Sequence, residues 1–254
     1  MSSTISSTPA LCAPPPPLPS PPLFVAALLH PSAYPHTAEA VQLRETHISW
    51  VFLAGAYAYK IKKPVALGFV DFSTIERRSR ACADEVRLNQ RLCPDVYLGV
   101  VSIVAREDGT LHVGGAGRVI EPAVKMRRLP DTGMLPALIE REAVDARLPD
   151  RLALHLARFH ATATTGAGVD EWGTPAAIRA NWADNFAETA AVSAAALPTA
   201  IVGTVRAAIE RVLREQHPLL ARRVADGYIR DGHGDLHCGN VCVEGRRIRL
   251  FDCL

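Results

Sequence analysis

The chain contains the run His233-Gly234-Asp235-Leu236-His237-Cys238-Gly239-Asn240, and Asp252 follows twelve residues later at the end of an apolar segment. An Asp and an Asn with four residues between them in a tight loop can face one cluster of magnesium and phosphate. The Asp can receive a hydroxyl proton while the Asn amide oxygen binds the metal, and Asp252 would supply a second carboxylate. The run therefore predicts a rigid loop for phosphoryl-transfer chemistry, held between short strands at 227–230 and 241–243.

This chemistry also needs a lysine that reaches the nucleotide phosphates and a glutamate that pairs with the lysine. The segment Ala58-Tyr59-Lys60-Ile61-Lys62-Lys63-Pro64 is close to the strand motif V-A-I-K, with Lys60 in the lysine position and Lys62 on the same strand face. Glu85 is the expected partner of Lys60. It lies in a helix predicted at about 75–92, whose start is marked by Ser73 and Glu76 in capping-box spacing.

The pattern H-G-D-L-H-x-x-N, followed by a strand that ends in Asp, resembles the aminoglycoside phosphotransferase and choline kinase branch of the protein-kinase-like superfamily. The resemblance implies that Asp235 is the catalytic base and that Asn240 and Asp252 bind Mg²⁺. It also implies that Lys60, held by Glu85, contacts ATP. The two residues after Asp252 depart from the D-F-G motif of protein kinases, so the resemblance implies nothing about a phenylalanine-driven activation switch.

The wider run from Glu45 to Val101 is similar to one bacterial group of this superfamily, which is often fused to a P-loop ATP-binding domain. The similarity covers about residues 40–254 in order. It implies transfer of the γ-phosphate of ATP to a hydroxyl of a small molecule, and a downstream P-loop domain or partner. The group does not identify the acceptor. The acidic residues of the helical region are mixed with arginines, so we expect a hydroxylated metabolite rather than a polycationic antibiotic.

No glycine-rich G-x-G-x-x-G motif precedes Lys60. The loop from Thr46 to Ser49 is therefore expected to cover the phosphates with backbone N–H groups and hydroxyls. The alternative is the segment Ala54–Tyr57, which is simpler to interpret as a turn between two strands. By its place in the order of elements, the segment from Met126 to Leu129 is expected to meet the adenine.

Composition places the chain among cytoplasmic globular proteins. It has 254 residues, of which 48% are hydrophobic, and 28 basic against 26 acidic side chains. This balance produces no strong electrostatic field around the protein. The net charge therefore gives no indication that nucleic acid or an anionic membrane is a partner. The longest apolar run, Leu23–Leu29, is too short to span a bilayer. The six cysteines lack a paired framework and are expected to be reduced thiols.

The expected architecture is an α+β, two-lobed protein-kinase-like fold. Residues 1–22, rich in Ser and Pro, are predicted to be a disordered tail. Residues 23–129 form the predicted nucleotide-binding lobe, a small antiparallel sheet with one main helix, and residues 130–254 the helical lobe with the catalytic loop. Helices are predicted at 134–146, 149–163, 175–195, 200–216 and 218–226. Related kinases continue beyond the residue that corresponds to Asp252, so we expect this lobe to be incomplete.

Two alternatives stay open. One is a structural zinc module, because His233, His237, Cys238 and Cys242 lie within ten residues and Cys253 could join them. Its spacing is unfavourable, since His-x-x-x-His ligands normally share a helix face and the glycines disfavour a helix here. The other is a kinase-like module or fragment that binds ATP but no longer catalyses transfer.

Overall fold

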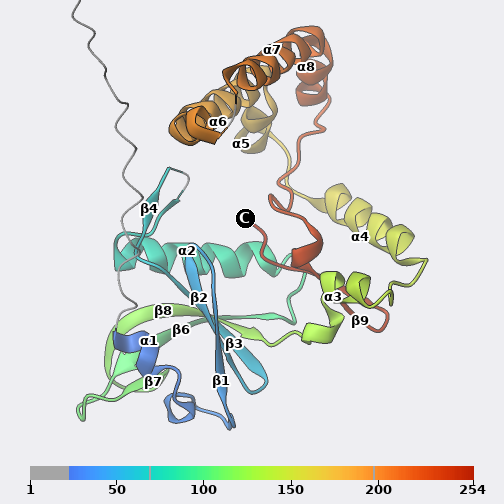
Figure 1. The fold of residues 1–254 in the computed structure, drawn as a ribbon. Coiled ribbons are helices and arrows are strands. Elements are labelled where there is room, and N and C mark those ends of the chain that lie inside the picture. The colour runs from blue at the N-terminus through green and yellow to red at the C-terminus, as the bar shows by residue number, and fades with distance from the viewer. Residues whose placement is uncertain (1–22, 69, 197) are drawn as a thin grey trace, which may run out of the picture.

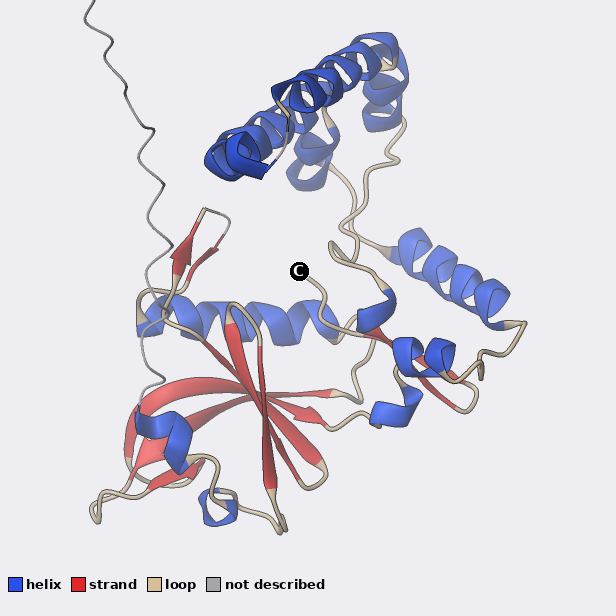
Figure 2. Cartoon of the chain, viewed as in Figure 1, coloured by secondary structure: helices blue, strands red, loops and turns tan. Residues whose placement is uncertain are grey.

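A six-stranded antiparallel sheet forms one half of the computed structural model, which describes residues 23–68, 70–196 and 198–254 but not the side chains of 23 and 191–196. The strand order is β1-β2-β3-β8-β6-β7 (Figures 1 and 2). The strands are β1 (Val41–Glu45), β2 (Ser49–Ala54), β3 (Tyr57–Lys62), β6 (Tyr97–Ala105), β7 (Leu111–Val113) and β8 (Arg118–Arg127). The predicted tail lies outside the described residues.

The central strands β2 and β3 are buried on both faces, and their alternation divides the core into two layers. Tyr59 and Ile61 point into the layer covered by α1 (Leu23–Ala27) and the 3₁₀ turn η1 (Pro31–Ala33), while Ala58 packs with residues of α2 on the opposite face. Side chains two residues apart share a face, so Lys60 follows Ala58 toward α2. In the middle of the sheet, Lys60 is paired with Val51 on β2 and with Val124 on β8.

Helix α2 (Ile75–Asn89) crosses the sheet on the face that carries Lys60 (Figure 1). Its N-cap is Thr74, whose hydroxyl accepts from the backbone N–H of Arg77 at 3.3 Å, rather than the predicted Ser73. Ser73 instead donates from its own N–H and hydroxyl to Asp71. The helix was predicted correctly in position, and a small hairpin of β4 (Ala66–Leu67) and β5 (Val70–Asp71) precedes it.

The other half is mostly helical and contains one short hairpin. Its elements are η2 (Asp131–Gly133), α3 (Leu135–Glu140), α4 (Leu148–Thr162), α5 (Ala167–Asp170), η3 (Glu171–Gly173), α6 (Pro175–Ala196), α7 (Thr199–Glu215), α8 (His217–Ala225), η4 (Cys238–Asn240), β9 (Val241–Glu244) and β10 (Arg247–Leu250). Leu148 and Phe159 of α4 are buried against Val241, Ile248 and Leu250 of the hairpin. The hairpin therefore rests on an apolar base and leads the chain directly to Asp252.

Charged side chains join the two halves. Arg127, at the end of β8, binds Glu244 of β9 through two parallel hydrogen bonds of 2.9 and 2.8 Å. Arg91, just after α2, donates to the carboxylate and carbonyl of Asp231 at 2.8 and 3.1 Å, and to the carbonyl of Gly232 at 3.0 Å. These contacts tie the sheet and α2 to the hairpin at β9 and to the segment that leads into residues 233–240.

Several predicted elements differ from those observed. The segment at 227–230 is not a strand, because its backbone has no neighbouring strand to pair with; the N–H of Tyr228 instead donates to the carbonyl of Arg223 in α8. The helix predicted at 134–146 ends at Glu140, shortly before the positive φ of 53° at Glu142. The first strand, β1, was not predicted as a strand.

The α+β, two-lobed protein-kinase-like architecture is confirmed, with its antiparallel sheet and its mostly helical second half. The predicted lobe boundary at residues 129 and 130 falls in the segment between β8 and α3. Within the described ranges, no helix is both long enough and apolar enough to cross a membrane.

Candidate active site

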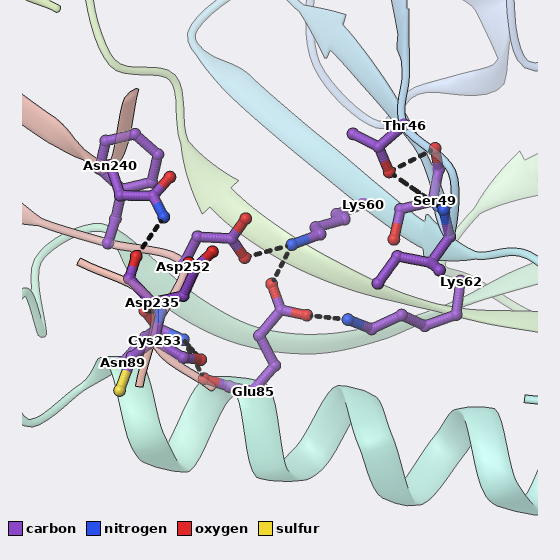
Figure 3. Close-up of polar contacts among 12 residues, drawn as sticks. Thr46, Ser49, Lys60, Lys62, Glu85, Asn89, Asp235, Asn240, Asp252 and Cys253 are labelled. Atoms are coloured by element: carbon purple, nitrogen blue, oxygen red, sulfur yellow. Dashed lines mark hydrogen bonds and ion pairs between the residues drawn. The ribbon is translucent and has the colours of Figure 1, made fainter. Parts of the chain in front are cut away.

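Lys60 lies between two carboxylates that come from distant parts of the chain (Figure 3). Its Nζ is 3.0 Å from Glu85 Oε1 and 2.5 Å from Asp252 Oδ1. The side chains of Lys60 and Glu85 are only 11% and 5% exposed, whereas that of Asp252 is 40% exposed. A strand, a helix and the segment after β10 thus converge on one buried ammonium group.

A second lysine shares the same glutamate. Lys62 is two residues from Lys60 on β3, and its ammonium donates to Glu85 Oε2. Glu85 therefore contacts one lysine with each carboxylate oxygen. The three buried groups carry a net positive charge, which the Asp252 carboxylate offsets.

This charge pairing shifts the pKa values of Lys60 and Asp252. Burial by itself would lower the pKa of Lys60, but the neighbouring Glu85 and Asp252 carboxylates outweigh it and raise the pKa above its ordinary value. Burial by itself would raise the pKa of Asp252, but Lys60 outweighs it and lowers the pKa below its ordinary value. Lys60 and Asp252 are therefore both charged at neutral pH.

Asp252 has an unusual backbone conformation. Its φ of 61° lies in the left-handed region, where few residues other than glycine are found. The N–H of Asp252 donates to the Tyr97 hydroxyl at 3.1 Å, and the next residue, Cys253, is bound on both sides of its backbone by the Asn89 side chain. Such a conformation persists only where the surroundings hold it.

The run 233–240 forms a tight loop beside Asp252. The Asn240 amide donates to the Asp235 carbonyl at 2.9 Å, which leaves the Asn240 Oδ1 oxygen as the atom that can bind a cation. The carbonyl of Asn240 accepts from the N–H of Phe251 at 3.1 Å, so Asn240 lies next to the segment that carries Asp252. The Asp235 side chain is 55% exposed and is accessible to a small molecule.

His233 anchors this loop. The N–H of Asp235 donates to His233 Nδ1 at 3.4 Å, and His233 Nε2 lies 3.1 Å from the Phe251 carbonyl, so the proton is assigned to Nε2. Burial lowers the pKa of His233, which favours this neutral form.

A cavity of about 220 Å³ opens beside the charged cluster, between the sheet and the segment after β8. Thr46, Met126 and Leu129 line it, as do Tyr97 and Phe251. Its other lining residues are Arg44, Val51, Leu53, Ala58, Val96, Arg127, Arg128, Asp131 and Met134. The surface is predominantly apolar, which suits a flat heterocycle. Two of its lining residues, Tyr97 and Phe251, adjoin Asp252, through the hydrogen bond of Tyr97 and through the chain itself.

Of the four residues predicted to lie in the phosphate-covering loop or beside the adenine (Thr46, Ser49, Met126 and Leu129), Ser49 alone does not line this cavity. It is fully buried, and its N–H donates to the Thr46 hydroxyl at 3.0 Å. The N–H of Ile48 is also directed at this hydroxyl, at 3.4 Å. A turn does join β1 to β2 at these residues, but the contacts to Thr46 fold it back on itself. The Ser49 hydroxyl is buried and has no hydrogen-bond partner among the described residues.

Sequence reasoning missed Asn89, Tyr97 and Arg91 as residues that shape the site, and it noted Lys62 without its contact to Glu85. Asn89 carries a usable signal, because it lies four residues after Glu85 and therefore on the same helix face. Tyr97 carries none, since an aromatic residue at a strand start is ordinary in a core.

The donors near Asp252 fit magnesium better than zinc. Asp252 and Asn240 offer carboxylate and amide oxygens, the hard ligands that Mg²⁺ prefers. In contrast, Cys242 and Cys253 are buried in separate contacts, with Pro130 and Arg91. Across the part of the chain that the structure describes, no group of three or more His, Cys, Asp or Glu side chains could hold a metal ion, so the zinc alternative has no ligand set there.

Comparison with known proteins identifies the family. Residues 68–253 match the model of the Phosphotransferase enzyme family. Uncharacterized proteins from Mycobacterium tuberculosis (Rv2004c) and Mycobacterium bovis (Mb2027c) are each 33% identical over 223 residues, which is 87% of this chain and 43% of the relative. The chain thus spans less than half the length of these relatives. No solved structure shows a significant match. Since the family match covers well over half of the chain, the chain belongs to the phosphotransferase enzyme family.

Proposed function

We propose that this chain is an ATP-dependent phosphotransferase that transfers the γ-phosphate to a hydroxyl of a small molecule. Family membership supports phosphotransfer in general. The observation that carries the proposal is the convergence of Lys60, Glu85 and Asp252 beside the loop of Asp235 and Asn240. These are the groups that phosphoryl transfer requires, and Tyr97 and Phe251, which adjoin Asp252, line the apolar cavity.

ATP would place its adenine in the cavity beside Met126 and Leu129 and its phosphates near Lys60. The raised pKa of Lys60 keeps its ammonium charged, so it can pair with phosphate oxygens. Glu85, on helix α2, holds that ammonium in place, and Lys62 adds positive charge to the same region. Thr46 lines the cavity and is exposed, which supports a role for the loop between β1 and β2 in covering the phosphates.

Magnesium would be held by the Asn240 side-chain oxygen and the Asp252 carboxylate, and when bound it would offset the negative charge of the phosphates. Asp235 would orient the acceptor hydroxyl and take its proton, because its exposed carboxylate projects from a loop whose backbone is fixed by His233 and Asn240. Proton removal and nucleotide binding thus depend on different side chains.

The acceptor is proposed to be a hydroxylated small molecule. A downstream P-loop domain or partner, which the resemblance implies, stays part of the proposal. The alternative that the chain binds ATP without transferring phosphate predicts the same nucleotide binding but no product, so a turnover assay separates the two.

The test measures ADP production by the wild-type chain and by Asp235→Asn, with magnesium, ATP and a panel of sugars, amino alcohols and nucleosides. We expect at least one acceptor to stimulate ADP production by the wild type but not by the variant, while both bind magnesium-ATP equally. A wild-type chain that does not bind magnesium-ATP at millimolar concentration would refute the proposal. Binding without turnover on any acceptor would favour the non-catalytic alternative.

A further inference from the structure

We infer that Asn89 and Tyr97 are positioning residues that set the magnesium affinity of this site by holding the backbone on both sides of the Asp252 carboxylate. The inference rests on the proposed function and adds two residues to it. Neither side chain is expected to touch the metal or the nucleotide phosphates. Their action is on the conformation of residues 252 and 253.

Both polar atoms of the Asn89 side chain form hydrogen bonds with backbone groups. Its Nδ2 donates to the carbonyl of Glu85 at 2.9 Å and to the carbonyl of Cys253 at 3.2 Å. Its Oδ1 accepts from the N–H of Cys253 at 2.8 Å (Figure 3). The residue has no solvent exposure. One side chain therefore binds both backbone groups of the residue that follows Asp252, and binds them to the turn of α2 that carries Glu85.

Tyr97 holds the other side. Its hydroxyl accepts from the N–H of Asp252 at 3.1 Å, and its ring is 1% exposed in the core. Between these two anchors, Asp252 is kept at a φ of 61°. A left-handed conformation in a residue with a side chain is costly, and it relaxes when the contacts that impose it are removed.

A competing contact makes this restraint relevant to the metal. The Asp252 carboxylate lies 2.5 Å from the Lys60 ammonium, so a magnesium ion must share or replace that interaction. A fixed backbone keeps the carboxylate at the Asn240 side of the site while its side chain rotates. A backbone free to relax would let the carboxylate follow Lys60 instead. Partners that orient a metal-binding carboxylate typically affect metal affinity by about 10–100-fold.

A purely structural role for Asn89 and Tyr97 would lower stability without changing the response to magnesium. The helix cap at Thr74 provides the matched control, because Thr74→Ala weakens the same helix at its far end without touching residues 252 or 253. Tyr97→Phe keeps the buried ring and removes only the hydroxyl. It remains informative if Asn89→Leu fails to fold.

The experiment titrates magnesium into each protein with a fluorescent ATP analogue and measures the magnesium concentration that gives half of the maximal gain in binding. We expect the midpoint, measured against each protein's own magnesium-free binding, to rise about 10–100-fold in Asn89→Leu and in Tyr97→Phe, with the Thr74→Ala midpoint unchanged. An unchanged midpoint in Tyr97→Phe, or an equal rise in Thr74→Ala, would overturn the inference while leaving the proposed function intact. A wild-type chain without magnesium-dependent binding would overturn both.

Discussion

Replacing Glu85 by Gln removes the carboxylate that two buried lysines share. Lys60 would keep its contact of 2.5 Å with Asp252. Lys62, whose side chain is only 8% exposed, would lose its ion pair. Its ammonium would keep the contact with the Phe72 ring, whose centre lies 5.4 Å away. The variant therefore leaves a buried cation without a carboxylate, which is far more costly than losing a surface pair.

The expected loss of stability in Glu85→Gln follows from the burial of Lys62. Removing one partner of a buried ion pair typically destabilises a protein by about 3–5 kcal/mol. For a domain of this size, each kcal/mol lowers the melting temperature by roughly 2–4 °C, so Glu85→Gln should lower it by roughly 6–20 °C. The change is a large fraction of a total stability of about 5–15 kcal/mol.

The assay is thermal and urea unfolding followed by circular dichroism, with Asp84→Asn as the control. Asp84 is adjacent on α2, but its pair with Arg87 is exposed at 51% and 65%, so its loss should cost less than about 1 kcal/mol. The double variant Lys62→Met with Glu85→Gln should recover part of the loss, because it no longer buries an unpaired ammonium. If Glu85→Gln is no less stable than Asp84→Asn, the buried triad does not stabilise the fold as argued.

The remaining predictions concern catalysis, nucleotide binding and pH. Asp235→Asn should lower turnover by about a hundred- to ten-thousand-fold with ATP affinity unchanged, which kinetics and titration calorimetry can check; full turnover would show that Asp235 is not the base. Lys60→Met should weaken ATP binding by about 1.5–3 kcal/mol, or roughly 10- to 150-fold, and equal affinity would place the phosphates elsewhere. Because burial lowers the pKa of His233 in the folded state, its contribution to stability is present above the unfolded value of about 6.5 and is lost as pH falls through the folded value. His233→Gln should therefore flatten the decline in unfolding free energy below pH 6.5, and an unchanged slope would contradict this assignment.

The convergence of Lys60, Glu85 and Asp252 could be predicted because the residue types and their order are restrictive. An Asp and an Asn in a glycine-flanked loop, a lysine on a strand and a glutamate on a helix each have other uses, but together they match one kind of site. The structure brings Lys60, Glu85 and Asp252 into contact although 192 positions separate the lysine from the aspartate. The structure also confirms the sheet-and-helix architecture. This architecture could be predicted because hydrophobic periodicity and helix caps are local signals.

The residues that hold this site could not be predicted in the same way. Asn89 and Tyr97 contact the backbone of residues 252 and 253. The spacing of Asn89 from Glu85 places it on the same helix face, but it does not identify a partner so far along the chain, and Tyr97 has no signal at all. The positive φ of Asp252 is equally invisible, because the sequence has no glycine there. Ser49 was expected at the end of a loop with a hydroxyl available to the phosphates. It is instead the first residue of β2, and tertiary packing buries its side chain.

The most direct test of the central claim is a crystal structure with magnesium and a non-hydrolysable ATP analogue. The account predicts the adenine in the cavity beside Met126 and Leu129, phosphate oxygens within hydrogen-bond distance of Lys60, and a metal bound by Asn240 and Asp252. A nucleotide bound elsewhere, or a metal bound away from both Asn240 and Asp252, would contradict it.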